Sequence, residues 1–197
     1  ECVSRFMEAV SEKASALGMT SSTFTRPAGD GGNTTTARDL LRMLVEASGY
    51  KDITRIWGKD TRSIPVLGDN ARTVTVNTTV TDPDLEGAYY VFGGKTGSWA
   101  GTENLAIVAE TESHGIVAGV ITNATSGAAR FDAMKELLDV VDGDGTSVAS
   151  AVSAIACAVP SGNVFQYEGY PFPVLYEQSA DTETIPASVT KVLTAMV

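Results

Sequence analysis

Residues 104–123, NLAIVAETESHGIVAGVITN, contain two apolar runs separated by a short polar turn. The first run covers 104–110, the second covers 115–123, and the turn between them holds His114. Two apolar runs joined by a short polar turn that ends in glycine are typical of an antiparallel β-hairpin. The sequence therefore predicts a hairpin near the middle of the chain, with His114 in solvent at its turn.

Helices and further strands are predicted on both sides of this hairpin. Apolar residues at helical spacing predict helices at 2–17, 36–48, 52–57, 128–141 and 186–197. Apolar and β-branched runs predict strands at 72–80, 88–96, 152–159, 163–168 and 173–176. We interpret the small apolar residues of 148–159, VASAVSAIACAV, as a buried strand, because the run is too short to span a bilayer. The mixture predicts an α+β fold in which helices flank an antiparallel sheet.

The composition excludes several classes of function. With 43% hydrophobic and 19% charged residues in a chain of 197, disorder is excluded, and a net charge of −10 excludes nucleic-acid binding through a general positive field. One histidine and two isolated cysteines cannot build the usual zinc sites. Cys2 and Cys157 form either one disulfide or two free thiols, and free thiols are the default expectation. Because His114 lies in a polar turn, any nucleophilic chemistry is expected to use a different base.

A Ser-x-x-Lys motif follows Pro186 near the predicted last helix. Ser188 falls in the first helical turn, and the spacing of three places its hydroxyl on the same face as the Lys191 ammonium. A lysine held in a poorly solvated cleft beside other cations can lose its proton and act as the base for such a serine. The same spacing recurs at 48–51, SGYK, but there the serine ends a helix and Gly49 breaks the geometry. The motif alone is equally compatible with an ordinary serine at a helix start.

A Lys-Thr-Gly motif lies at the end of a strand-like run, within residues 93–99, GGKTGSW. Lys95 and the hydroxyl of Thr96 can bind a carboxylate, and Gly97 would let a substrate backbone lie against the strand. Alone, this motif is also compatible with a glycine-bounded turn. Together with Ser-x-x-Lys it forms a motif pair of serine acyl-transfer enzymes.

The chain as a whole resembles the D-alanyl-D-alanine carboxypeptidases, low-molecular-weight penicillin-binding proteins with a β-lactamase-like, transpeptidase fold. The similar segments cover most of the chain: 6–24, 27–29, 36–40, 76–78, 93–97, 130–131, 135–138, 174–177 and 185–195. The resemblance implies a bacterial, extracytoplasmic enzyme, secreted or associated with the cell envelope. It also implies peptidoglycan peptides ending in D-Ala-D-Ala as substrates, β-lactams as covalent inhibitors, and no metal or organic cofactor.

The resemblance implies a role for each motif residue. Ser188 would attack the substrate carbonyl with Lys191 as its base, and the backbone N–H groups of Ser188 and Ser98 would form the oxyanion hole. Lys95 and Thr96 would hold the terminal carboxylate of the substrate. Two alternatives stay open: a β-lactamase or esterase of the same fold, and a catalytically impaired fragment or binding-only domain.

The chain departs from the family in two ways. Its order is rotated, because 148–197 resemble the opening of the family domain while 1–142 resemble its closing portion, with 143–147 as the join in a single domain. This order indicates either a circular permutant or two pieces written out of order. The family's Ser-x-Asn segment, part of the helical lobe, is expected between Val197 and Glu1, where the helices look cut, so a missing segment or a second chain would supply it. The one Ser-x-Asn here, at 161–163, is interpreted as a turn.

Overall fold

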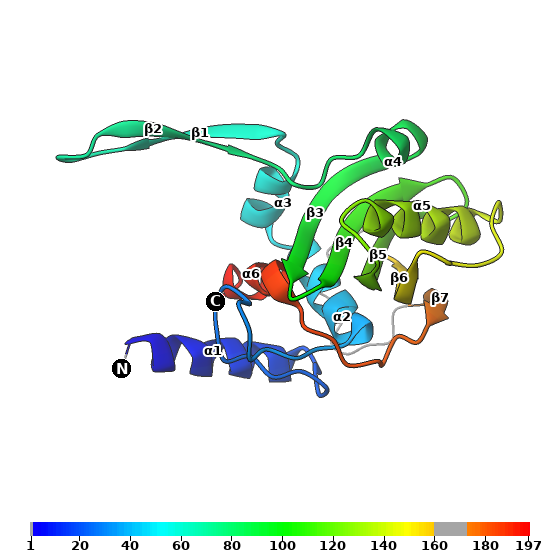
Figure 1. Ribbon diagram of the computed structural model, residues 1–197, viewed down its shortest axis with the longest axis horizontal. Coiled ribbons are helices and arrows are strands. Elements are labelled where there is room, and N and C mark those ends of the chain that lie inside the picture. Colours follow the sequence, from blue (N-terminus) through cyan, green and yellow to red (C-terminus); the bar gives the residue numbers. More distant parts are fainter. Residues whose placement is uncertain (1, 160–172) are drawn as a thin grey trace.

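The computed structural model describes residues 2–159 and 173–197 of the chain. The helices are α1 (Cys2–Ala16), α2 (Ala37–Ser48), α3 (Lys51–Trp57), α4 (Pro83–Ala88), α5 (Ala129–Asp142), the 3₁₀ turn η2 (Ala187–Val189) and α6 (Thr190–Thr194). The strands are β1 (Thr61–Val66), β2 (Arg72–Asn77), β3 (Tyr90–Trp99), β4 (Thr102–Thr111), β5 (Gly115–Ala124), β6 (Ala151–Ala158) and β7 (Val174–Gln178). The α+β class and the antiparallel sheet flanked by helices are confirmed (Figure 1).

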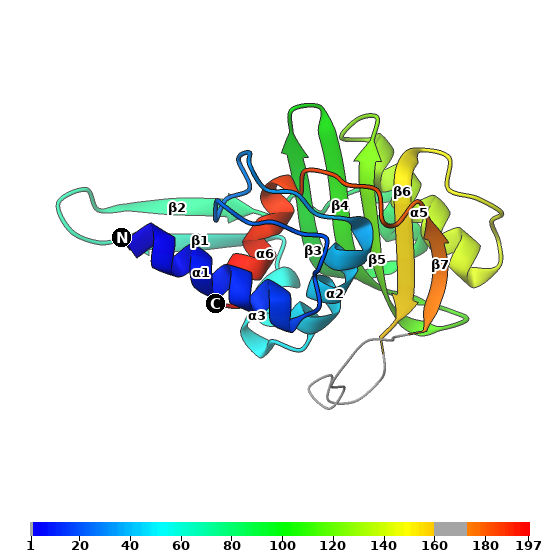
Figure 2. The ribbon, with the colours of Figure 1, turned by 90° about the horizontal axis from the view of Figure 1, so that it is seen from below.

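The predicted hairpin is the centre of the main sheet. β4 and β5 pair in an antiparallel register that includes Ala106 opposite Val120, and His114 is exposed at the turn between them. Within the described residues, five strands follow the order β3-β4-β5-β6-β7, so β3 and β7 are the edges of this part of the sheet. A separate two-stranded sheet, β1-β2, projects away from this body (Figure 2).

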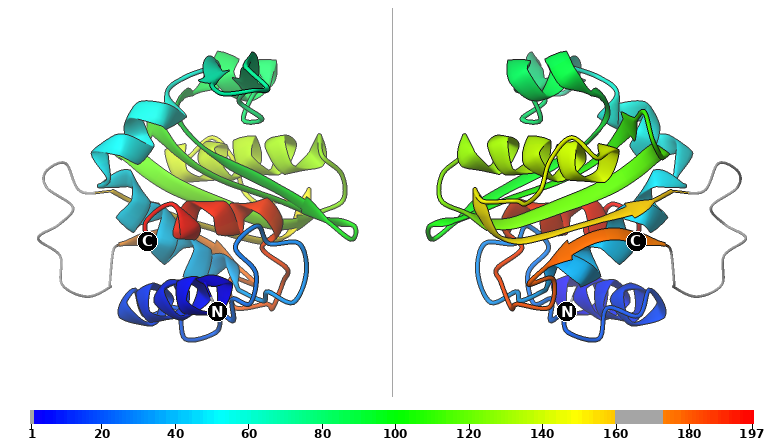
Figure 3. Two further views of the ribbon diagram at one scale, coloured as in Figure 1. Left: turned by 90° about the vertical axis from the view of Figure 1, so that its left-hand side faces the viewer. Right: turned by 90° about the vertical axis from the view of Figure 1, so that its right-hand side faces the viewer.

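Helices cover both faces of the main sheet, which explains why its central strands are apolar throughout. Alternate residues of β4 face opposite sides: Ala106 and Val108 pack in the core with α2, whereas Leu105 and Ile107 pack in the core with α5. Figure 3 shows α5 on one side of the sheet and α1, α2 and α6 on the other. A one-residue slip of register would exchange the two sets of side chains between these cores, so the pattern also specifies the register.

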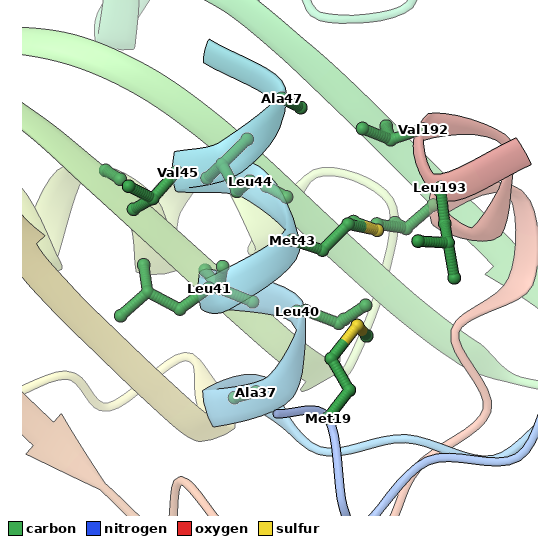
Figure 4. Packing of buried hydrophobic residues seen from close by; sticks show 14 of the residues in the cluster. Met19, Ala37, Leu40, Leu41, Met43, Leu44, Val45, Ala47, Val192 and Leu193 are labelled. Atoms are coloured by element: carbon green, nitrogen blue, oxygen red, sulfur yellow. The ribbon is translucent and has the colours of Figure 1, made fainter. Parts of the chain in front are cut away.

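The α2 helix links the sheet to the turn that carries Ser188. Its Thr36 N-cap side chain accepts a hydrogen bond from the Asp39 backbone N–H, at 3.1 Å. Its fully buried leucine and methionine side chains pack together with Val192 and Leu193 of α6 (Figure 4). This packing fixes the position of α6 on the face of the sheet that α2 covers.

The two portions of the chain, 1–142 and 148–197, contribute strands to the same sheet. β6 lies between β5 and β7, and a short connection joins it to the end of α5. The Glu136 carboxylate of α5 accepts hydrogen bonds from the backbone N–H groups of Ala149, at 2.7 Å, and Ser150, at 3.1 Å. The last residues before β6 are therefore held against α5.

The structure differs from the sequence-based expectations at several elements. The strand predicted at 72–80 is β2 of the projecting hairpin, and neither its partner β1 nor α4 was predicted. The helix predicted at 186–197 is wrong in extent, because the 3₁₀ turn η2 precedes a short α6 that ends at Thr194. The strand predicted at 163–168 and the Ser-x-Asn turn at 161–163 lie outside the described residues.

The two cysteines are free thiols, as the default expectation had it. Cys2 is exposed on α1, and Cys157 is buried in β6, where burial raises the pKa of its thiol to about 12. A thiol with so high a pKa is a packing residue and a poor nucleophile at neutral pH.

Candidate active site

Ser188 and Lys191 lie side by side at the junction of η2 and α6. The Lys191 ammonium donates a hydrogen bond to the Ser188 hydroxyl, with 2.7 Å between Nζ and Oγ. The spacing of three residues therefore places the two groups together, as the sequence predicted. Ser188 is half-buried, but Lys191 is exposed, so the described residues do not enclose this lysine in the poorly solvated cleft that we expected.

The edge strand β3 lies directly against the Ser188 turn. A β-carbon at Gly97 would stand 2.7 Å from the carbonyl oxygen of Pro186 and 3.2 Å from the backbone nitrogen of Val189. Contacts this close cannot accommodate a side chain. The missing side chain of Gly97 therefore makes room for the protein's own η2, and the expected contact of Gly97 with a substrate backbone stays a prediction.

The fold changes the proton affinity of Lys95. Burial lowers the pKa of Lys95 to about 8, with further lowering by the neighbouring cations Lys191 and Arg130. Its ammonium donates to the carbonyl oxygen of Thr96 at 2.7 Å. The structure thus gathers three cations, Lys95, Lys191 and Arg130, of which Lys95 and Arg130 are partly buried and Lys191 is exposed.

The remaining residues of the Lys-Thr-Gly-Ser run already have partners. Thr96 is buried, and its hydroxyl forms a hydrogen bond of 2.6 Å with the hydroxyl of Thr79. When Thr79 donates this bond, the Thr96 proton stays available for a ligand. Ser98 is exposed, and its hydroxyl donates to Glu103 at 2.5 Å and accepts from Arg130 at 2.9 Å.

The sequence did not indicate Arg130 as a site residue, although it lies in this region. It forms an ion pair of 2.8 Å with Glu103, and 12% of its side chain is exposed against 22% for Glu103. Burial lowers the pKa of Arg130, opposed by the Glu103 carboxylate. A signal was present, because a cation in the first turn of a helix opposes the helix dipole and needs a compensating partner.

The segment that leads into Ser188 is fixed to the sheet by side-chain and backbone hydrogen bonds. Thr184 exchanges backbone hydrogen bonds with Thr35, at 2.8 and 2.9 Å. The buried Asn104 amide donates to the Ile185 carbonyl at 2.8 Å, and the Thr184 hydroxyl donates to Asn123 Oδ1 at 2.8 Å. The backbone therefore reaches the Ser188 turn along one defined path.

The second Ser-x-x-Lys stretch is not a site of this kind. Ser48 is the last residue of α2, and its hydroxyl donates to the carbonyl of Val45 at 2.6 Å, within its own helix. The prediction that this stretch is a chance match to the motif agrees with that geometry.

A cavity of about 480 Å³ lies near the start of β3 and is lined by residues such as Trp57, Asp60 and Tyr90. Between residues 2–159 and 173–197, no three His, Cys, Asp or Glu side chains are grouped so that they could hold a metal ion. In the same part of the chain, no helix has the length and apolarity needed to cross a membrane.

Comparison of the chain with protein-family models, curated proteins and solved structures finds no match.

Proposed function

We propose that this chain is the serine-bearing part of a D-Ala-D-Ala carboxypeptidase that acts on peptidoglycan stem peptides and binds penicillin. The observation that carries the proposal is the 2.7 Å contact between the Ser188 hydroxyl and the Lys191 ammonium, next to the Lys-Thr-Gly strand. The proposal includes a transpeptidase-like fold in permuted order, without part of its helical lobe. It also includes an extracytoplasmic location in a bacterium.

The reaction would proceed through an acyl-enzyme. Ser188 Oγ attacks the carbonyl carbon between the two D-Ala residues while a neutral Lys191 takes the hydroxyl proton. The tetrahedral intermediate places its negative oxygen at the N–H groups of Ser188 and Ser98. Its collapse breaks the peptide bond, the terminal D-Ala leaves with a proton as the free amino acid, and water then hydrolyses the ester.

The cations around Ser188 suit a substrate that ends in a carboxylate. Lys95 lies on β3, Arg130 donates to Ser98 of the same strand, and the Thr96 hydroxyl completes the proposed carboxylate site when Thr79 is its donor. A peptide amide at the same position, without a terminal charge, would leave the Lys95 ammonium without a carboxylate partner, whereas Arg130 already pairs with Glu103. This difference favours a carboxypeptidase over a general esterase of the same fold.

The exposure of Lys191 favours a second candidate function, a penicillin-binding domain that reacts slowly. The described residues do not give Lys191 the poorly solvated surroundings in which a lysine acts as a base. A segment carrying a Ser-x-Asn motif, from this protein or a second chain, would cover Lys191 and remove water from it. Under this second reading the chain alone forms a covalent adduct but turns over substrate slowly.

A labelled penicillin tests both readings. We expect a covalent adduct whose mass-spectrometric position is Ser188 and which is lost in Ser188→Ala. Ser48→Ala serves as the matched control, because it removes the serine of the other Ser-x-x-Lys stretch and should leave the adduct intact. An adduct on any other residue would refute the assignment. Hydrolysis of the adduct within seconds would favour a β-lactamase, and normal D-Ala release by the chain alone would overturn the slow-turnover reading.

A further inference from the structure

The loop at 25–33 is closed around one buried side chain, Asn33. Its Oδ1 accepts the backbone N–H groups of Thr25, at 2.8 Å, and Arg26, at 3.0 Å, and its Nδ2 donates to the Arg26 carbonyl at 2.8 Å. The second N–H of Nδ2 points out of the loop and donates a hydrogen bond to the Thr190 hydroxyl, at 3.2 Å. Asn33 is 1% exposed, and Thr190 is fully buried. The Asn33 side chain therefore forms hydrogen bonds with the backbone of its own loop and also with Thr190, the residue just before Lys191.

The backbone of the same loop touches the residue just before Ser188. Gly29 has a φ of +79°, and a β-carbon there would stand 1.8 Å from the Ala187 carbonyl oxygen and 2.8 Å from the Thr190 hydroxyl oxygen. Only glycine fits at this distance, because both the conformation and the space exclude a side chain. The loop therefore contacts η2 and α6 at two points, once through Asn33 and once through Gly29.

Ala187, between these contacts and Ser188, has an unfavourable backbone conformation. It is buried and has a φ of +50°, in the left-handed region that residues with a β-carbon rarely adopt. Such a conformation persists only where the surrounding structure holds it. The loop contacts η2 on one side, and β3 contacts it through Gly97 on the other. The peptide between Ala187 and Ser188 is consequently oriented from both sides.

We infer that Asn33 is a positioning residue for the nucleophile: through Thr190, and together with Gly29, it holds Ala187 in the left-handed conformation that sets the Ser188 hydroxyl against Lys191. The inference rests on the proposed function for its catalytic meaning. It assigns no contact between Asn33 and a substrate. Its consequence is that loss of the Asn33–Thr190 bond changes the geometry of Ser188 more than it changes the stability of the fold.

The test uses Thr190→Val, which keeps the shape of the side chain and removes the hydroxyl that Asn33 binds. We expect the rate of acylation by labelled penicillin to fall 10- to 100-fold, while the unfolding midpoint falls only modestly because the buried Asn33 N–H loses its acceptor. Thr190→Ser keeps the hydroxyl and should restore the rate to within about threefold of the wild type. Thr194→Val is the matched control, because Thr194 donates to the Lys191 carbonyl within α6 and does not contact the loop.

A crystal structure of Thr190→Val separates this inference from the proposed function. We expect residue 187 to leave the left-handed region and the distance between Ser188 Oγ and Lys191 Nζ to exceed hydrogen-bonding range. If Ala187 keeps its positive φ and the distance is unchanged, the inference is wrong, whatever the reactivity. A wild-type acylation rate in Thr190→Val would also overturn it. If the wild type is not acylated, the proposed function fails, and the crystal structure alone decides the positioning role.

Discussion

Gly97 of β3 lies in direct contact with Pro186, the residue that introduces the turn bearing Ser188. The distance of 2.7 Å from a hypothetical β-carbon to the Pro186 carbonyl oxygen leaves no space for even a methyl group. The third position of the Lys-Thr-Gly motif is thus a packing requirement between two parts of the chain that are far apart in sequence.

Gly97→Ala is expected to push η2 away from β3. The forced separation should destabilise the fold by about 1–3 kcal/mol, as overpacked sites do, and lower the rate of Ser188 labelling more than tenfold. Urea unfolding and labelling kinetics measure the two effects. Gly87→Ala is the control, because a β-carbon at Gly87 meets no atom within 4 Å: it should leave labelling unchanged and be neutral or slightly stabilising, since Gly87 lies in α4. Labelling of Gly97→Ala at the wild-type rate would contradict the contact.

Lys95→Met is expected to change how stability depends on pH. The native pKa of Lys95 is about 8 and its ordinary value is 10.5, so between these pH values the unfolded chain keeps a proton that the native protein has released. Raising the pH across this window therefore stabilises the wild type relative to Lys95→Met. Below pH 8 the variant should be the more stable protein, by about 1–2 kcal/mol after allowance for solvent screening. Urea titrations at several pH values measure this, and parallel curves for both proteins would refute it.

Arg130 and Glu103 are expected to be coupled. Arg130→Met leaves the Glu103 carboxylate half-buried without its cation, which should cost about 1–3 kcal/mol of stability. Adding Glu103→Gln should recover part of this loss, because it removes the uncompensated charge. A double-mutant cycle by chemical denaturation measures the coupling, and additive effects of the two substitutions would show that the pair contributes nothing.

Asn104→Ala is expected to be among the most harmful polar substitutions. Asn104 is fully buried, and its amide binds the Ile185 carbonyl while its Oδ1 accepts the Asn123 backbone N–H at 3.2 Å. Removing it leaves two partly buried backbone groups without these partners and a cavity at a fully buried position, so we expect a loss of about 2–4 kcal/mol. Thermal unfolding measures the loss. Asn70→Ala, at an exposed loop position, is the control, and an equally small effect of both substitutions would contradict the role of Asn104.

The central sheet and its covering helices could be predicted because their apolar patterns are long and regular. The β4–β5 hairpin and α5 follow the periodicities of strand and helix over many residues, and tertiary packing reinforces both. The β1 strand could not be predicted in this way, because its residues are mostly exposed and include Pro65. A proline and a missing apolar face remove the two signals by which a strand is recognised.

The candidate site was only partly predictable for a different reason. The spacing of Ser188 and Lys191 fixes their mutual distance locally, so the sequence alone was sufficient for that pair. The left-handed conformation of Ala187, which interrupts the predicted helix, depends on contacts with Gly29 more than 150 positions away. The environment of Arg130 likewise depends on which strand lies beside α5. Contacts between residues so far apart in the sequence cannot be predicted from local sequence patterns.

The position of β3 at the edge of the sheet has a consequence for how the protein is made. Ribosomes synthesise β3 well before η2, since 91 positions separate Gly97 from Ser188. Until η2 arrives, β3 around Gly97 lacks the part of the chain that packs on it, and the exposed Phe92 and Trp99 of this edge strand would favour pairing with a strand of another nascent chain. Docking of the Ser188 turn therefore completes the candidate site and, in the same step, covers part of a strand through which newly made chains would aggregate.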